Sequence, residues 1–234
     1  MNYLSHFYMD IDHPDPYFQF GTILPDLIRS VDRKLRIPKS LLLTTDGNDN
    51  IQQLSLGCNR HFEVDDLFHN SNFFREHTSQ IKTLLYERNL QNPKLKTHLL
   101  AHVLLELMLD RLLIKLDITI CDRFYVCLKK VEYDNLNILL NKISYYDHQL
   151  LCDYLDRFQQ SQYLYSYEFN DKIIFALNRI FSRVGINDLL KGYEHDFLNF
   201  IEEVEVIIKK DFENMFTTLS KQIAKESPYL KTPH

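Results

Sequence analysis

Apolar side chains recur at helical spacing along most of the chain. Ile51, Leu54 and Cys58 are separated by three and four residues, which places them on one face of a helix. The same period predicts helices over the ranges 17–31, 51–62, 70–89, 94–116, 119–132, 133–144, 147–162, 169–183 and 187–224. We therefore expect an all-α fold, a helical bundle in which the amphipathic helices bury their apolar sides.

Proline, glycine and short polar residues mark the boundaries between these helices. The segment 13–16, His-Pro-Asp-Pro, predicts a turn near the start of the chain, and the segments 46–50 and 92–93 predict two more. Pro25 falls near the middle of the range 17–31. The helix there either spans the whole range or begins at Pro25, because proline suits the first turn of a helix and disrupts its interior.

The composition is typical of a folded helical domain. Hydrophobic residues make up 45% of the 234 residues, and the chain has only 5 glycines and 7 prolines, which favours long helices with few connections. We expect a single domain over residues 1–226 and a frayed tail at 227–234. No segment approaches the roughly 20 apolar residues of a membrane span, and the start lacks the basic residues of a signal peptide. A cytoplasmic location is therefore expected.

Charge and cysteine content narrow the class of protein further. The 27 basic and 32 acidic residues give a net charge of −5, without the basic excess of a nucleic-acid-binding protein. The chain has four cysteines, none of them in a CxxC pair: Cys58, Cys121, Cys127 and Cys152. We expect reduced, buried thiols, with two disulfides as the alternative, because a chain with a full core does not need covalent staples.

A stripe of ionisable residues runs along the most apolar predicted helix. His98, His102, Glu106 and Asp110 follow one another at intervals of four residues and so lie on one face. Burial of such groups is costly unless they are paired, protonated or bound to a metal. At 1.5 Å per residue the stripe is about 18 Å long, so only neighbouring members can share one ion. The alternative is that Glu106 and Asp110 pair with Arg111 or with other arginines, and that the histidines satisfy helix ends.

A second set of candidate ligands lies in the segment 57–69. His61 and Asp65 are four residues apart, and His69 follows at the next turn. Imidazole and carboxylate together suit Zn, Mn or Fe, although Asp65 could instead cap a helix or form a salt bridge. His6 is a further candidate in an apolar segment, with a satisfied core histidine as the alternative. So is Asp26, which could simply pair with Arg29 one turn away.

In their order along the chain, these segments resemble the acyl carrier protein phosphodiesterase family, part of the wider HD-domain phosphohydrolase group. The start, MNYLSHFYM, is similar to the family's first segment and contributes His6. GTILPDLIRSV resembles the family's Gly-x-Leu-Leu-x-Asp-x-x-Arg segment. The matching positions are Gly21, Asp26 and Arg29, then Gly57, His61 and Asp65, then Glu106 and Asp110, and near the end Arg179, Arg183, Tyr193 and Phe197.

The chain departs from the family pattern at several positions near these motifs. The family has Thr-Asp where this chain has Phe68-His69, so an imidazole replaces a carboxylate. It has Asp-His where this chain has Asp110-Arg111, and aspartate where this chain has Glu106. His98 and His102 are additions to the pattern. A histidine at position 69 or 102 would compensate for a lost ligand.

The resemblance implies an HD-domain-like helical fold and hydrolysis of the phosphodiester that joins 4′-phosphopantetheine to acyl carrier protein. It implies a divalent cofactor, with Mn expected and Fe or Zn as alternatives, at one or two ions per chain. Its implied metal ligands are Asp26, His61, Asp65, His69, Glu106 and Asp110. Its implied catalytic residues are Asp26, His6, which would orient a ligand or water, and Arg29, which would hold the phosphate.

Acyl carrier proteins are acidic, so docking needs a local basic surface on this acidic chain. A short stretch beside Asp26 carries Arg29, Arg33, Lys34, Arg36 and Lys39, which would supply that surface or simply form a solvated loop. Three other functions stay open. They are a related phosphohydrolase with a small phosphorylated substrate, a degenerate family member that only binds a partner, and a ferritin-like di-metal bundle. The last lacks the paired Glu-x-x-His signature.

Overall fold

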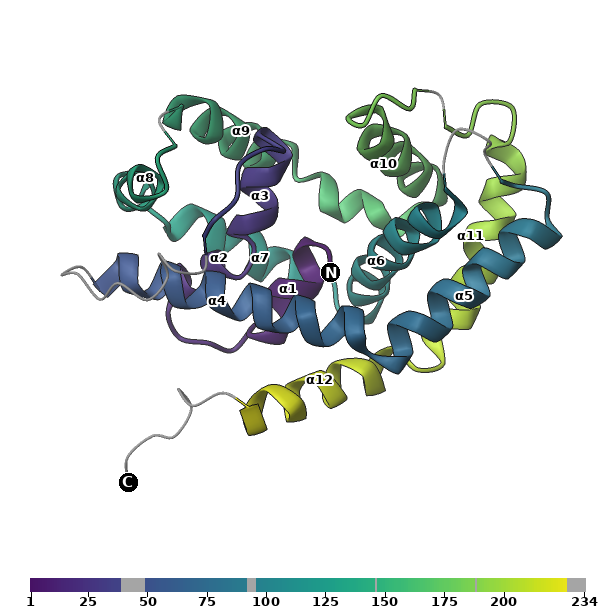
Figure 1. Ribbon diagram of the computed structural model, residues 1–234, viewed down its shortest axis with the longest axis horizontal. Helices are drawn as coiled ribbons and strands as arrows, with labels where there is room; N and C mark the ends of the chain where they lie inside the picture. The colour runs from purple at the N-terminus through teal and green to yellow at the C-terminus, as the bar shows by residue number, and fades with distance from the viewer. Residues whose placement is uncertain (39–48, 92–95, 146, 188, 227–234) are drawn as a thin grey trace. The chain divides into compact units, whose positions relative to one another are not determined.

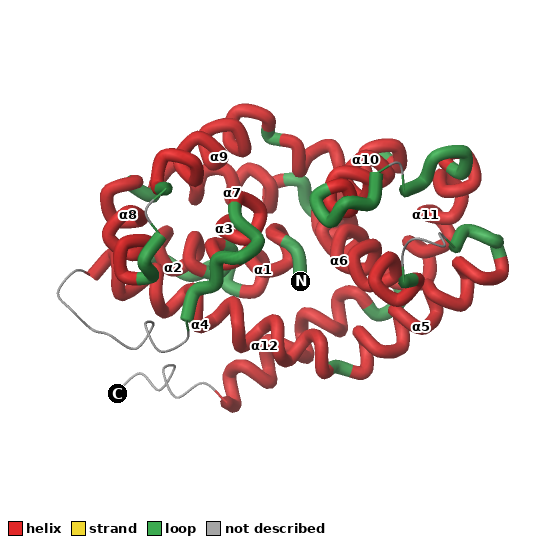
Figure 2. The backbone as a smooth tube through the Cα atoms, turned by 45° about the horizontal axis from the view of Figure 1, so that its top comes forward, coloured by secondary structure: helices red, strands yellow, loops and turns green. Residues whose placement is uncertain are grey.

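The computed structural model describes residues 1–38, 49–91, 96–145, 147–187 and 189–226, and these ranges contain helices and loops without any strand (Figures 1 and 2). The all-α prediction is therefore confirmed. The helices are α1 Tyr3–Met9, α2 Pro16–Gly21, α3 Leu24–Val31, α4 Asp49–Asn70, α5 Asn72–Glu87, α6 Thr97–Leu116, α7 Thr119–Lys130, α8 Tyr133–Lys142, α9 His148–Ser161, the 3₁₀ helix Tyr163–Glu168, α10 Asn170–Ser182, α11 Glu194–Lys209 and α12 Phe212–Glu226.

Two of the predicted helices are divided in the structure. The range 17–31 holds α2 and α3, and Pro25 occupies the first turn of α3, close to the alternative in which a helix begins there. The single helix predicted over 187–224 is wrong. Gly192 has φ +87°, which only glycine adopts readily, so α11 begins after it, and the chain breaks again between α11 and α12. The predicted boundary at 92–93 and the tail at 227–234 lie outside the described residues.

Internal contacts divide the chain into two compact units. The first contains residues 1–66 and 118–164, and the second contains residues 67–117 and 165–234. Each unit is thus built from two segments that are distant in sequence, and α4 contributes its last residues, 67–70, to the second. The single domain expected over residues 1–226 stays a prediction.

In the first unit, α7 packs against α1, α2 and α9, and α9 also contacts α3 and α8. Its core is aromatic: the rings of Phe7 and Phe124 meet edge to face with centroids 5.4 Å apart. The segment 13–16, where a turn was predicted, provides the N-terminal cap of α2. The Asp15 carboxylate accepts hydrogen bonds from the backbone N–H groups of Tyr17 at 2.8 Å and Phe18 at 3.2 Å, and Pro16 follows at the first helical position.

Helices α2 and α4 meet backbone to backbone at two glycines. A Cβ atom on Gly57 would overlap the carbonyl oxygen of Phe18 and lie 2.7 Å from the Cα of Gly21. A Cβ on Gly21 would overlap the carbonyl oxygen of Leu54. No other residue fits at either position without moving a helix, so this contact fixes where α4 crosses α2.

In the second unit, α6 is surrounded by α5, α10 and α11. Twelve of its residues between Leu100 and Ile114 are buried, including Asp110 and Arg111. The Arg111 guanidinium reaches α11, where its Nε donates to the Glu205 carboxylate at 2.7 Å, and Lys115 donates to the same carboxylate at 2.7 Å. The sequence offered the alternative that Arg111 pairs with a carboxylate of its own helix. The contact seen here is instead with Glu205, which comes from α11.

Two smaller predictions concern the thiols and the membrane. All four cysteines are buried and free, so the expectation of reduced thiols is confirmed. None of the helices in the described ranges has the length and apolar character needed to cross a membrane.

Replacing Gly57 with alanine should lower the free energy of unfolding by about 2 kcal/mol or more, because the new methyl group collides with backbone that cannot rotate away. At an open helical position the same change would stabilise by about 1 kcal/mol, so the sign of the change is the test. Urea unfolding of Gly57→Ala, with Gln52→Ala on the exposed side of α4 as control, measures it. A stabilised Gly57→Ala variant would contradict the close contact.

The Arg111–Glu205 pair gives a second prediction, about pH. Burial raises the pKa of Glu205, but Lys115 and Arg111 lower it more, so the net pKa lies below its ordinary value. The stabilisation is therefore complete above about pH 4.5 and is lost as the pH falls through the folded-state pKa. Glu205→Gln should cost about 2 kcal/mol at neutral pH, because the almost fully buried Arg111 loses its counter-ion.

Glu203→Gln is the matched control, because Glu203 lies on the same helix and pairs with Arg88 at a similar 2.8 Å but on the surface. It should cost under about 1 kcal/mol. Urea unfolding at pH 6.5 and pH 4 should show the gap between wild type and Glu205→Gln narrowing at the lower pH. A gap that stays constant would show that the carboxylate charge contributes nothing.

Candidate metal sites

The first cluster of metal-ligand side chains lies in the first unit. It brings together His6 from α1, Asp26 from α3 and His61 from α4, with one donor atom of each within 4.8 Å of the others. His6 and His61 are buried, with exposed fractions of 1% and 4%, while the Asp26 side chain is 26% exposed. Three of the residues predicted from sequence, up to 55 positions apart, therefore converge on one point with one side open to solvent.

The glycine contact between α2 and α4 explains how Asp26 and His61 come together. His61 lies one turn beyond Gly57 on α4, and Asp26 lies in the first turn of α3, shortly after Gly21. The backbone carbonyl of Thr22, in the link between α2 and α3, accepts a hydrogen bond from Nδ1 of His61 at 2.8 Å. Nε2 of His61 then lies 3.9 Å from the Asp26 carboxylate.

The Thr22 carbonyl fixes the tautomer of His61. A carbonyl oxygen can only accept, so the His61 proton is on Nδ1 and the lone pair of the neutral ring is on Nε2, facing Asp26. A metal-binding histidine characteristically donates its other nitrogen to a carbonyl or carboxylate in this way. In this tautomer, His61 can bind a metal ion through Nε2.

His6 is buried with both ring nitrogens lacking a hydrogen-bond partner among the described residues. Its ring stacks on that of His61, with centroids 3.9 Å apart, and its Nε2 is 3.6 Å from the Asp65 carboxylate, too far for a hydrogen bond. Burial, followed by the nearby His61 and amino terminus, lowers the pKa of His6 well below its ordinary value. His6 therefore carries a free lone pair at neutral pH in a place where an unpartnered polar group is costly.

Asp65 lies beside this cluster but is paired differently from the other predicted ligands. Its carboxylate accepts a hydrogen bond from the amino group of Met1 at 2.7 Å, and its side chain is 36% exposed. The ammonium supplies the positive charge that this carboxylate faces in the structure.

The second cluster lies in the second unit and consists of His69 from the end of α4 with His102 and Glu106 from α6. Nε2 of His69 is 3.1 Å from Nε2 of His102 and 3.3 Å from Oε1 of Glu106, and Nε2 of His102 is 2.9 Å from the same oxygen. Burial would raise the pKa of Glu106, yet the two imidazoles are among the groups that bring it well below its ordinary value. Glu106 is therefore ionised at neutral pH.

The other predicted residues lie outside both clusters. Asp110 is fully buried on α6, Arg29 is exposed in the last turn of α3, and His98 is exposed near the start of α6. Of the four-residue stripe on α6, only the middle pair, His102 and Glu106, shares a cluster.

The ligand set implied by the resemblance contains His69 and Glu106, whereas His102 was predicted only as a member of the stripe and as a compensating histidine. The Thr22 carbonyl left no signal in the sequence, because every residue has a backbone carbonyl.

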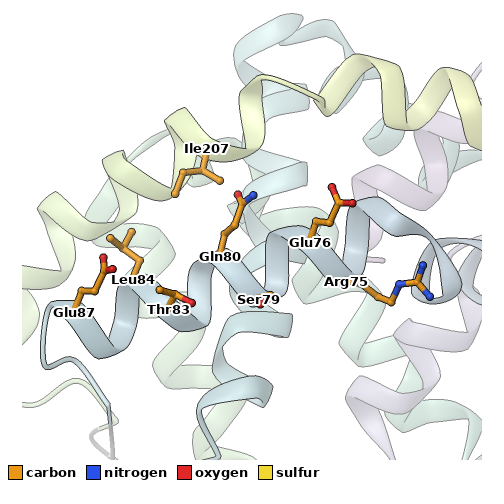
Figure 3. A pocket seen from close by; sticks show the side chains of 8 residues that line it. All are labelled: Arg75, Glu76, Ser79, Gln80, Thr83, Leu84, Glu87 and Ile207. Atoms are coloured by element: carbon orange, nitrogen blue, oxygen red, sulfur yellow. The ribbon is translucent and has the colours of Figure 1, made fainter.

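A separate surface hollow of about 530 Å³ lies along α5 (Figure 3). Its lining comes from one face of α5 together with Ile207 of α11. This face carries polar side chains such as Glu76, Gln80 and Glu87 but no histidine, and none of the residues of either cluster lines it. It offers no ligand set comparable to that of the clusters, so we regard it as a surface groove.

Comparison with known proteins gave no further information: no family model, no curated protein and no solved structure matches the chain significantly.

Replacement of His6 by phenylalanine separates a metal ligand from a structural histidine. Phenylalanine keeps the ring that stacks on His61 but removes two buried nitrogens without partners, so metal-free protein should be as stable as wild type or up to about 2 kcal/mol more stable. Urea unfolding at pH 7.5 after treatment with a chelator measures this.

His77→Phe is the matched control. His77 is equally buried and also stacks on an aromatic ring, that of Phe73, but its Nδ1 donates a hydrogen bond to the Phe73 carbonyl at 2.9 Å, a contact that His6 lacks among the described residues. This variant should be destabilised by about 1 kcal/mol or more. An equal loss in both variants would mean that His6 is a satisfied core residue.

Proposed function

We propose that the protein is a metal-dependent phosphodiesterase whose chemistry takes place at the cluster of His6, Asp26 and His61. The observation that supports this most is convergence. The residues that the resemblance to acyl carrier protein phosphodiesterases identifies lie in separate sequence segments, yet their donor atoms come within 4.8 Å. Chance matches to short motifs would not be expected to meet at one point in a folded chain.

The donor set fits a divalent cation such as Mn²⁺, Fe²⁺ or Zn²⁺. Nε2 of His61 presents a lone pair, Asp26 presents a carboxylate, and neutral His6 has nitrogens without other partners. An ion bound here would neutralise charge on phosphoryl oxygens and lower the pKa of a water molecule. Thr22 holds His61 in the required tautomer.

Arg29 is suited to binding the phosphate of the substrate. It lies three residues after Asp26 on α3, hence on the same side of the helix, and its side chain is exposed. A guanidinium can hold two phosphate oxygens at once. The carboxylate of Asp26 would hold the cation while Arg29 orients the anion that it attracts.

The substrate that we propose is the phosphodiester between 4′-phosphopantetheine and acyl carrier protein, which would place the protein in the cytoplasm. The segment after Asp26 carries four exposed basic side chains, which suit an acidic partner despite the net charge of −5. They are Arg29, Arg33, Lys34 and Arg36. Lys39, the remaining basic residue of this stretch, lies outside the described residues.

Incubation with holo-acyl carrier protein and Mn²⁺ tests the proposal, with released phosphopantetheine measured by mass spectrometry. Asp26→Asn and His61→Ala should each reduce the rate about 100-fold or more, because each removes a ligand of the ion. His148→Ala is the control, since His148 belongs to the same unit but bonds a backbone carbonyl, that of Tyr145, at 2.7 Å and lies outside the cluster.

Three outcomes are informative. Cleavage of a model phosphodiester without cleavage of the carrier would favour a small phosphorylated substrate. Binding of the carrier without cleavage would favour a partner-binding protein that has lost its chemistry. Activity that survives in Asp26→Asn and His61→Ala would remove the cluster from the mechanism.

A further inference from the structure

We propose that His69, His102 and Glu106 form a second metal site, which binds Zn²⁺ or a similar nitrogen-preferring transition ion. Its ligands come from the end of α4 and from α6, with one donor atom of each residue within 4.8 Å of the others. The inference concerns a ligand set of the second unit and does not depend on the proposed phosphodiesterase activity.

The spacing of the three donor atoms matches one face of a metal coordination sphere. With metal–ligand distances of 2.0–2.1 Å, two ligands of a tetrahedral Zn²⁺ ion lie about 3.3 Å apart, and two neighbouring ligands at right angles lie about 2.9 Å apart. The three distances here are 2.9, 3.1 and 3.3 Å. An ion could therefore bind with little movement of the side chains.

A bound ion would satisfy all three atoms at once. Each of the three atoms has the other two within 3.3 Å. A hydrogen on one of them points with good geometry at only one neighbour, whereas an ion in the centre would accept a lone pair from each of the three atoms.

The helices and their packing hold these side chains in position. His102 and Glu106 are four residues apart on α6 and so project from the same face. Phe74 of α5 packs edge to face against both imidazoles, with centroids 4.9 Å from each. The turn after His69 is fixed by Ser71, whose hydroxyl donates to the Phe68 carbonyl at 2.6 Å and accepts from the Phe74 N–H at 3.0 Å.

The ligand types and their exposure define the ion and its use. Two imidazoles and one carboxylate favour Zn²⁺, Fe²⁺ or Co²⁺ over Mg²⁺ and Ca²⁺, which prefer oxygen. The side chains of His69, His102 and Glu106 are 29%, 33% and 18% exposed, so the site is open to solvent. Three protein ligands with open positions are typical of catalytic or exchangeable zinc sites, whereas structural sites have four.

Titration with Co²⁺, followed by its visible absorption and by competition with Zn²⁺, tests the site. The titration uses His61→Ala protein, in which the first cluster has lost a ligand. That protein should still bind one equivalent, with the intense absorption of a low-coordinate Co²⁺ ion. Adding His102→Ala should weaken binding about 100-fold or more.

Adding His98→Ala instead should leave the binding unchanged. His98 lies on α6 one turn before His102, but it is exposed and outside the cluster. Circular dichroism is used to check that each variant is folded. If His102→Ala is not folded, His102→Gln takes its place. The proposal would be overturned if the variants with His102→Ala and His98→Ala bound Co²⁺ equally well. It would also be overturned if His61→Ala protein bound no Co²⁺. If the wild-type protein showed no phosphodiesterase activity while Co²⁺ still bound at His69, His102 and Glu106, the result would count against the proposed function alone.

Discussion

The first cluster depends on a backbone contact between two helices, made possible by glycine. Gly21 of α2 and Gly57 of α4 approach so closely that a single methyl group at either position would overlap a carbonyl oxygen. This contact sets the crossing of the helices, and the crossing brings the Thr22 carbonyl within hydrogen-bonding distance of His61. The orientation of the His61 ring, and with it the direction of its free lone pair, therefore follows from the absence of two side chains.

Both clusters bring ionisable groups from separate helices close together. In the first, His6 is neutral and its nitrogens have no hydrogen-bond partner in the part of the chain that the structure describes, which is costly for a buried group unless a ligand offsets it. In the second, the three donor atoms lie 2.9 to 3.3 Å apart, close enough to share one ion. The pair between Arg111 and Glu205 shows the alternative, in which a buried charge is fully compensated by its counter-ion and no ligand is implied.

The sequence predicted the helical class and most helix positions, because apolar residues at a period near 3.6 record which side of each helix is buried. It failed where one pattern covered two helices, at 187–224. Within such a range the break depends on a local backbone state, such as the positive φ of Gly192, that hydrophobic periodicity does not encode. Of the predicted metal ligands, four fall in the clusters and two, Asp65 and Asp110, do not; the four are Asp26, His61, His69 and Glu106. His6, which was predicted to orient a ligand or water, joins the first cluster.

By itself the sequence determined which residues could serve as ligands and that they lie on helices, since residue type and helical spacing are properties of the local chain. Only the tertiary structure decided how those residues are grouped. It separated His102 and Glu106 from His98 and Asp110 on the same stripe, and it paired Asp65 with the Met1 amino group. Grouping depends on where helices cross, and the crossing is set by close packing between segments distant in sequence, which no local spacing specifies.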